Sequence, residues 1–244
     1  MSDFDRNYAA RSAPFGRAVA VDEGLRAYML RVYNYMAIGV ALTGVAAYAT
    51  YQMVLSNPSL QQTLFSGPLY FVLLFVPLGL VFFLSFRIQH LQPATAQALF
   101  FIYAAILGVS LTPIFIVYTG ASIARVFFIS AASFGALSLY GYTTQRDLGP
   151  IGSFCIMGLF GIILASLVGL FFPSPGLSFV ISVVGVLVFA GLTAWDTQQI
   201  KEMYVEYDDG QVAGKKAIMG ALALYLDFLN LFLFMLQFLG QRRD

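Results

Sequence analysis

Two aspartates, Asp196 and Asp227, are the residues whose type and position in this chain could do chemistry. Each lies in a long apolar segment, whereas the other ten of the 12 acidic residues lie in polar stretches. A charged carboxylate at the centre of a membrane helix costs roughly 2.5 to 3.5 kcal/mol, so it is expected to face protein, water or an ion. We therefore take this pair as the candidate functional site.

Small and polar residues recur around both aspartates at helical spacing, which indicates helix faces that turn toward the protein interior. The two faces are predicted to share one interior cavity. Its lining is expected to include Thr193, Gln199 and Asn230, whose oxygens could assist the carboxylates. Counted from Lys201 and Lys216, the aspartates differ in depth by roughly 9 Å, so the sequence leaves their direct contact open.

Three functions from different classes are compatible with two carboxylates inside a membrane. In the first, Asp196 and Asp227 hold calcium weakly and transiently along a conduction path, and their protonation makes the path pH-sensitive. In the second, they share a proton around a catalytic water, as in intramembrane aspartyl proteases. In the third, the chain is a non-catalytic regulator that binds other membrane proteins through its helix surfaces.

The surrounding residues favour the conduction hypothesis over the protease. The Gly-x-Gly-Asp motif of the protease class is replaced here by Leu-Tyr-Leu-Asp, which leaves no obvious room for a substrate strand. The sequence also contains no phosphate-binding glycine loop, no metal-ligand cluster and no Ser-His-Asp set. We therefore expect a protein that is not an enzyme and needs no cofactor, with calcium as the permeating ion.

Two basic residues could pair with the aspartates. Arg87 and His90 lie at the end of an apolar segment, and either could act as a latch or counter-ion for the carboxylates. The single cysteine, Cys155, lies inside an apolar run and is expected only to pack.

The composition is that of a membrane protein. Of the 244 residues, 59% are hydrophobic and 10% are charged, whereas a typical soluble domain has roughly 25% charged residues. The 13 basic and 12 acidic residues nearly cancel, so no basic surface is available to hold nucleic acid. The lipid bilayer is the expected surrounding.

Apolar runs long enough to cross a bilayer, which takes about 20 residues, recur along the chain between turn signals. They predict an all-α membrane protein, with a seven-transmembrane helix bundle over residues 27–240. The stretch from Lys201 to Lys216 is predicted to be a loop. The seven runs are Val32–Tyr51, Leu69–Phe86, Gln97–Tyr118, Ile123–Tyr142, Ile151–Phe172, Leu177–Trp195 and Ala217–Leu239.

Basic residues predict the orientation, because 10 of the 13 fall on the amino-terminal side of the predicted spans. Residues 1–26 are therefore expected to form a cytoplasmic amino-terminal tail, and residues 241–244 a short carboxyl-terminal tail. Seven crossings place the carboxyl terminus outside, although Arg242 and Arg243 argue mildly against this. If they stay inside, one run must be re-entrant, either the last one or the one that contains Pro113.

Three segments resemble the Bax inhibitor-1 family. Gly191–Lys201, with the sequence Gly-Leu-Thr-Ala-Trp-Asp-Thr-Gln-Gln-Ile-Lys, and Gly220–Phe232, with Gly-Ala-Leu-Ala-Leu-Tyr-Leu-Asp-Phe-Leu-Asn-Leu-Phe, look like the double signature of that family. Phe134–Leu148 resembles the segment that ends the fourth helix of its proteobacterial members. Trp195 stands where the family usually has Tyr, and Leu229 where it has Ile.

The resemblance implies a seven-helix fold with the last helix at its centre, in a bacterial plasma (inner) membrane. It also implies a pH-sensitive calcium leak whose sensor is the aspartate pair of the sixth and seventh helices, here Asp196 and Asp227. In the family, a basic residue at the end of the second helix closes the path by bonding these aspartates, which corresponds to Arg87 or His90. Members are also described as suppressors of cell death or stress and as partners of membrane proteases.

Overall fold

The computed structural model describes the backbone of residues 3–65 and 67–243, and the side chains from residue 23 onward except those of residues 66, 70, 74, 89 and 244. Within these residues the chain is all-helical and contains no strand. The elements are α1 (Asp3–Ser56), α2 (Pro58–Phe65), α3 (Pro68–Arg87), the 3₁₀-helix η1 (Ile88–His90), α4 (Pro93–Ser110), α5 (Pro113–Val117), α6 (Gly120–Thr143), α7 (Gly149–Phe171), α8 (Pro175–Glu202) and α9 (Gly210–Leu239).

Prolines and polar caps set the helix starts. A proline lies in the first turn of α3, α4, α5, α7 and α8, where its missing N–H costs no intrahelical hydrogen bond. Where that proline is absent, a side chain caps the helix. Thr119 accepts a hydrogen bond from the Ser122 amide at the start of α6 (3.3 Å), and Asp209 accepts one from the Val212 amide at the start of α9 (2.7 Å).

Six helices are long and apolar enough to cross a membrane: Glu23–Ser56 of α1, α4 together with α5 (Pro93–Val117), α6, α7, α8 and α9. They correspond to six of the seven predicted runs. The remaining run corresponds to α3, whose apolar part, Phe71–Arg87, is shorter than these spans. The chain is thus a multi-pass membrane protein, and a seventh crossing stays a prediction.

Three boundaries differ from those expected. The predicted loop from Lys201 to Lys216 is wrong at both ends, because α8 continues to Glu202 and α9 starts at Gly210. The helix α2 lies between the first two predicted runs, in a stretch for which the sequence predicted only turns. At the amino terminus, α1 is helical from Asp3, so the predicted tail and the first span form one helix.

The third predicted run is interrupted at Pro113, where α4 gives way to α5. A proline has no N–H to donate to the carbonyl four residues earlier, which here is that of Val109. This carbonyl instead accepts a hydrogen bond from the Thr112 amide at 3.2 Å. The proline therefore produces a kink and does not leave this carbonyl without a partner.

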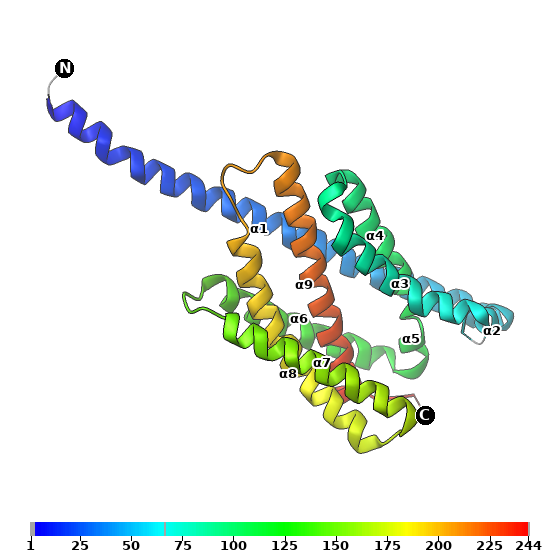
Figure 1. Cartoon of the computed structure of the whole chain (residues 1–244). Helices are drawn as coiled ribbons and strands as arrows, with labels where there is room; N and C mark the ends of the chain where they lie inside the picture. The colour runs from blue at the N-terminus through cyan, green and yellow to red at the C-terminus, as the bar shows by residue number, and fades with distance from the viewer. Residues whose placement is uncertain (1–2, 66, 244) are drawn as a thin grey trace.

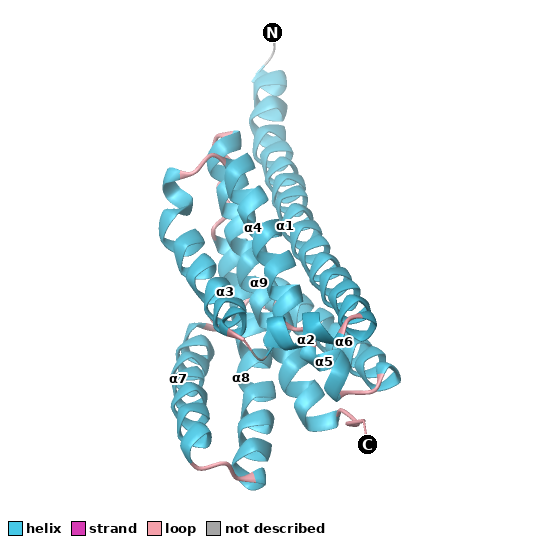
Figure 2. Ribbon diagram, turned by 90° about the vertical axis from the view of Figure 1, so that its right-hand side faces the viewer, coloured by secondary structure: helices cyan, strands magenta, loops and turns pink. Residues whose placement is uncertain are grey.

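The last long helix, α9, is the centre of the bundle. It packs against α1, α4, α6 and α8, and these neighbours lie around it in two views (Figures 1 and 2). In its most apolar stretch 61% of the residues are buried, compared with 11% in α7, which packs mainly on α8. Small residues such as Ala217 and Ala221, both fully buried, let the neighbouring helices approach closely.

Contacts among the connections define the end of the bundle that carries the α8–α9 connection. The ring of Tyr204 in that connection lies 5.7 Å from the ring of Tyr28 of α1. At the start of α9, a methyl group built on Gly214 would lie 3.2 Å from Pro93 of α4. Tyr28 of α1, the α8–α9 connection and the starts of α4 and α9 therefore lie at the same end of the bundle.

The carboxyl-terminal segment lies at the opposite end, as both ribbon views show (Figures 1 and 2). It is extended and pairs with the connection between α5 and α6. The Thr119 amide donates to the Gln241 carbonyl at 3.1 Å, and the Arg243 amide donates to the Val117 carbonyl at 2.8 Å. The Arg243 guanidinium also donates to the Tyr51 hydroxyl of α1 at 2.7 Å.

Candidate functional site

The site is built on the antiparallel pair α8 and α9, whose register is set by two glycines. A methyl group built on Gly220 of α9 would lie 2.9 Å from the Ile200 side chain of α8. One built on Gly185 of α8 would lie 2.5 Å from the Phe234 ring of α9. Because a methyl group at either point would force its neighbour to shift, the two glycines allow this close approach and mark the register of the two helices.

This register brings the two aspartates together. Extrapolated from the two glycine contacts, it places Asp196 about one helical turn from Asp227 along the helix pair. The two carboxyl groups are close enough to interact with each other. Two ionised carboxylates can only accept hydrogen bonds, so such a pair needs a shared proton or a cation between its oxygens.

Asp227 is the more deeply buried member of the pair, with 4% of its surface exposed. Its Oδ2 atom is buried and has no hydrogen-bond partner among the described residues. Buried polar atoms are nearly always satisfied, so an oxygen of this kind indicates a position for a proton, a water or an ion. The geometry therefore fits the oxygen chemistry expected from the sequence.

Counting residues from Lys201 and Lys216 overstates the difference in depth between Asp196 and Asp227, because the two lysines do not lie at the same level along the bundle. Lys216 donates to the Met203 carbonyl at 2.9 Å, beyond the end of α8, and to Asp208 at 2.6 Å. Lys201 lies within α8 and donates to the Tyr142 carbonyl at 2.9 Å. The depths counted from these residues therefore start from different planes.

Two of the three expected lining residues lie on α8 and α9 close to the level of the pair. Thr193 is fully buried and lies level with Asp227 in the register of the helices, with its hydroxyl donating to the Phe189 carbonyl at 2.7 Å. Asn230 lies one turn beyond Asp227 and donates to the Leu226 carbonyl at 2.8 Å.

The third expected lining residue, Gln199, lies apart from the pair. Its amide is directed toward Glu202 at the exposed end of α8, 3.4 Å away. It therefore faces the aqueous end of the helix and not the carboxylates.

The two basic candidates lie outside the pair in this structure. Arg87 ends α3, His90 ends η1, and both side chains are exposed. Among the described residues, no hydrogen bond or ion pair joins either of them to Asp196 or Asp227. The latch contact is thus not formed here, and the role of these residues stays a prediction.

The residues that hold α8 in place after Asp196 were not predicted from the sequence. The side chain of Gln198 accepts a hydrogen bond from the Leu148 amide and donates one to the Arg146 carbonyl, both at 2.8 Å. Gln198 thereby fixes the connection between α6 and α7. The signal was an amide side chain two residues after the candidate aspartate, inside an otherwise apolar helix.

A chain of hydroxyl groups also ties α8 to its neighbours. The Thr197 hydroxyl lies 2.9 Å from that of Ser138 on α6, which in turn lies 2.6 Å from that of Tyr33 on α1. Thr197 and Ser138 are buried. Three helices are therefore joined at the residue that follows Asp196.

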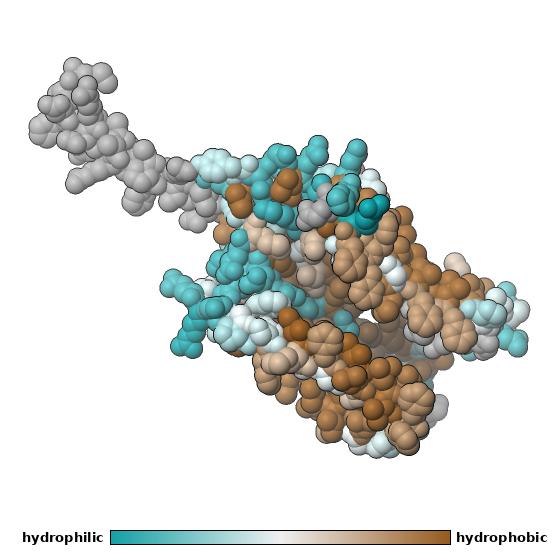
Figure 3. Space-filling model, viewed as in Figure 1, coloured by the Kyte–Doolittle hydropathy of each residue, from teal (hydrophilic) through white to brown (hydrophobic). Residues whose placement is uncertain are grey.

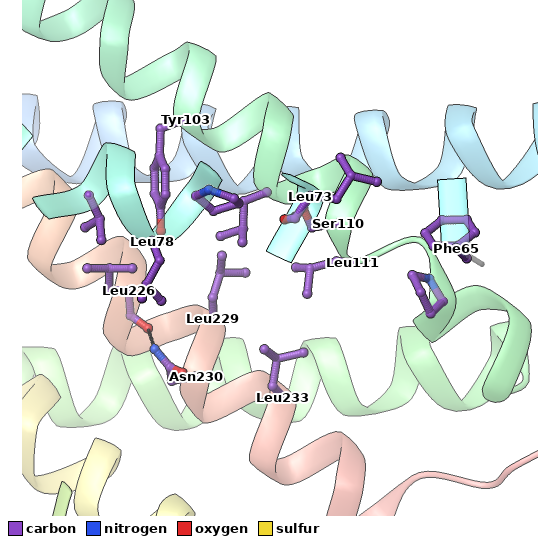
Figure 4. A pocket seen from close by; sticks show the side chains of 14 residues that line it. Phe65, Leu73, Leu78, Tyr103, Ser110, Leu111, Leu226, Leu229, Asn230 and Leu233 are labelled. Carbon is purple, nitrogen blue, oxygen red and sulfur yellow. Dashed lines mark hydrogen bonds between the residues drawn. The ribbon is translucent and has the colours of Figure 1, made fainter. Parts of the chain in front are cut away.

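Hollows flank α9 on either side of Asn230. One of about 380 Å³ lies between α3, α4 and α9, and the close view shows Asn230 and the Tyr103 side chain at its border (Figure 4). Another of about 360 Å³ lies between α7, α8 and α9. In the space-filling view, the apolar surfaces of α3 and α7 are separated by a hollow (Figure 3).

A proline in α3 belongs to the first of these hollows. Pro77 removes the amide that would bond the Leu73 carbonyl, and the Ser110 hydroxyl of α4 donates to this carbonyl at 2.7 Å instead. The helix α3 is thereby tied to α4 beside the hollow.

The comparisons with known proteins show the family of this chain. Residues 25–244 match the family model described as inhibitor of apoptosis-promoting Bax1. An uncharacterized protein of Rickettsia prowazekii is 52% identical over 225 residues, which cover 91% of this chain and 93% of that protein. The inner membrane protein YbhL of Escherichia coli K12 is 45% identical over 224 residues, covering 90% and 94%.

A more distant relative has the same extent. An uncharacterized membrane protein of Streptococcus pyogenes is 37% identical over 222 residues, which cover 90% of this chain and 95% of that protein. The match thus includes the region of both aspartates and nearly the whole of each relative. The chain belongs to the Bax inhibitor-1 family of membrane proteins.

Proposed function

We propose that this protein is a pH-sensitive calcium leak of the bacterial inner membrane, in which Asp196 and Asp227 form both the pH sensor and an ion-binding site along the path. The observation that carries the proposal is the unpartnered, buried Oδ2 of Asp227 beside a second carboxyl group. A site of this kind binds a proton or a hard cation, and one excludes the other.

The oxygen count supports a transient site. Calcium prefers roughly six to eight oxygen ligands, more than two carboxylates can supply. The Thr193 hydroxyl lies level with Asp227, Asn230 lies one turn beyond it, and water would complete the shell. Incomplete protein ligation gives weak binding, which a conduction path requires because the ion must leave as readily as it enters.

The test is calcium entry into liposomes that contain the purified protein and an enclosed calcium dye. Wild-type protein should admit calcium in a pH-dependent manner, and the pH dependence should be lost in both Asp196→Asn and Asp227→Asn. Asp209→Asn is the matched control, because it neutralises an acidic N-cap outside the site and asparagine caps a helix equally well. Calcium entry equal to that of empty liposomes at every pH, with the protein folded, would disprove the proposal.

The same assay separates the rival functions from conduction. A leak needs only the bundle, whereas a regulator of stress responses or of membrane proteases needs its protein partner. An intramembrane aspartyl protease would instead cleave an added membrane peptide, and either Asp→Asn change would abolish the cleavage.

A further inference from the structure

Polar groups lie at two levels of the α8–α9 interface beyond the aspartate pair. The nearer level is Asn230, which borders the hollow of about 360 Å³ between α7, α8 and α9. The farther level is a polar pocket of about 400 Å³ at the carboxyl-terminal end, with Ser182, Gln237 and Arg242 in its wall. Ser182 is almost fully buried, so this pocket reaches into the helix interface.

The aromatic ring of Phe234 lies between these two levels. Phe234 follows Asn230 by about one turn and precedes Gln237 by about one turn on the same face of α9. The ring faces Gly185, where even a methyl group would lie 2.5 Å from it. It also stacks on Phe189 of α8, with 5.7 Å between ring centroids and 26° between planes.

We propose that Phe234 is a plug that separates the polar level at Asn230 from the outer pocket at Gln237. An apolar constriction in a narrow passage stops hydrated ions, because water leaves it. A methyl group at position 185 would collide with the ring as it lies here, so Gly185 leaves the room that the closed position of Phe234 needs. The inference rests on the proposed ion path, for which it names the outer barrier.

The chain offers a matched control for this ring. Phe238 lies one turn further along α9, packs on Phe179 at 5.6 Å, and is 45% exposed. It borders the outer pocket but does not lie between the two polar levels. Removing its ring deletes the same chemical group without opening the barrier.

The experiment measures access to a cysteine at Asn230, in a Cys155→Ser background that has no other cysteine. A membrane-impermeant thiol reagent is added from the side of the carboxyl-terminal segment. Phe234→Ala should accelerate labelling several-fold, Phe234→Leu should do so to a smaller extent, and Phe238→Ala should leave the rate unchanged. If Phe234→Ala fails to fold, as judged by gel filtration in detergent, the leucine variant carries the test.

Equal labelling rates in the parent and in the Phe234 variants would disprove the proposed plug. Rapid labelling of the parent would also disprove it, because the intact ring would then not block access to position 230. Calcium entry is measured separately on Phe234→Ala and Phe238→Ala with Asn230 intact, and a several-fold increase is expected for the first alone. Accelerated labelling without calcium entry in any protein would remove the calcium leak and leave the plug in place. The two proposals can therefore fail independently.

Discussion

Gln198 contributes the two hydrogen bonds that fix the connection between α6 and α7 next to the candidate pair. The Leu148 amide that it accepts from belongs to a residue with 2% of its surface exposed, so water is not a ready substitute. Among the described residues, its neighbour Gln199 has a side-chain hydrogen-bond partner only at the exposed end of α8. The two adjacent glutamines are thus expected to contribute differently to the stability of the fold.

We expect Gln198→Ala to destabilise the protein by about 1–3 kcal/mol, because it leaves a buried amide without a partner. Gln199→Ala should change the stability by less than about 0.5 kcal/mol, as a surface substitution does. Thermal unfolding of both variants in the same detergent measures the difference. Equal melting temperatures for the two variants would show that the contacts of Gln198 do not hold the loop.

The latch can also be tested at the level of single residues, because Arg87 and His90 both lie exposed near the start of α4. If a basic side chain closes the path by bonding the aspartates, its removal should increase calcium entry into liposomes at the pH where the wild type is closed. Arg87→Ala and His90→Ala compared side by side identify the residue. No increase in either variant would remove the latch from both.

At the scale of the helices, the spans were predictable and the contact between the aspartates was not. Long apolar runs and prolines in the first turn are local signals, and they placed most of the helix boundaries within a few residues. The contact depends on the register of α8 and α9, which arises from Gly220 against Ile200 and Gly185 against Phe234. Such pairings join residues far apart in the sequence, and a single sequence does not reveal them.

The missed features have different origins, one local and one long-range. The helix α9 starts at Gly210 because Asp209 caps it, although its first turns are polar and therefore read as a loop. The hydrogen bonds of Gln198 to the connection between α6 and α7 depend on how α6, α7 and α8 pack together, which the sequence does not reveal.

The crossing of α6 and α8 gives a prediction at this scale. A methyl group built on Gly141 of α6 would collide with the backbone of α8 at the Ala194 carbonyl, two residues before Asp196. Gly141→Ala should therefore destabilise the protein by about 1–3 kcal/mol through overpacking. On the same helix, no described residue lies within 4 Å of a methyl group built on Gly135. Gly135→Ala should leave the stability unchanged or raise it by about 0.5–1 kcal/mol.

Unfolding in detergent measures both glycine variants, and pH-dependent calcium entry tests whether the shift reaches the site. Because the collision displaces α8 next to Asp196, we expect Gly141→Ala to alter the pH dependence and Gly135→Ala to leave it as in the wild type. Identical behaviour of the two variants would mean that the crossing does not position the aspartate.

At the scale of the whole molecule, the contacts at the two ends of the bundle constrain how often the chain crosses the membrane. Tyr28 lies at the end that carries the α8–α9 connection, and Tyr51 lies at the carboxyl-terminal end, so α1 links the two ends. Pro93 again lies at the first end, beside Gly214. The segment between, which consists of α2, α3 and η1, must therefore return through the bundle, and this favours α3 as a seventh crossing.

We predict that the end with the α8–α9 connection is cytoplasmic, since it carries most of the basic residues. Single cysteines in a Cys155→Ser background test this in intact cells and in inverted vesicles with an impermeant thiol reagent. Cysteines at Asp5 and Gln145 should react only from the cytoplasmic side, and one at Gln61, in the exposed helix α2, only from outside. If the cysteines at Gln61 and Gln145 react from the same side, the number of crossings between them is even, and α3 is not a crossing. If the cysteine at Asp5 reacts from outside, the one at Gln145 from outside and the one at Gln61 from the cytoplasm, the number of crossings stands and the orientation in the membrane is inverted.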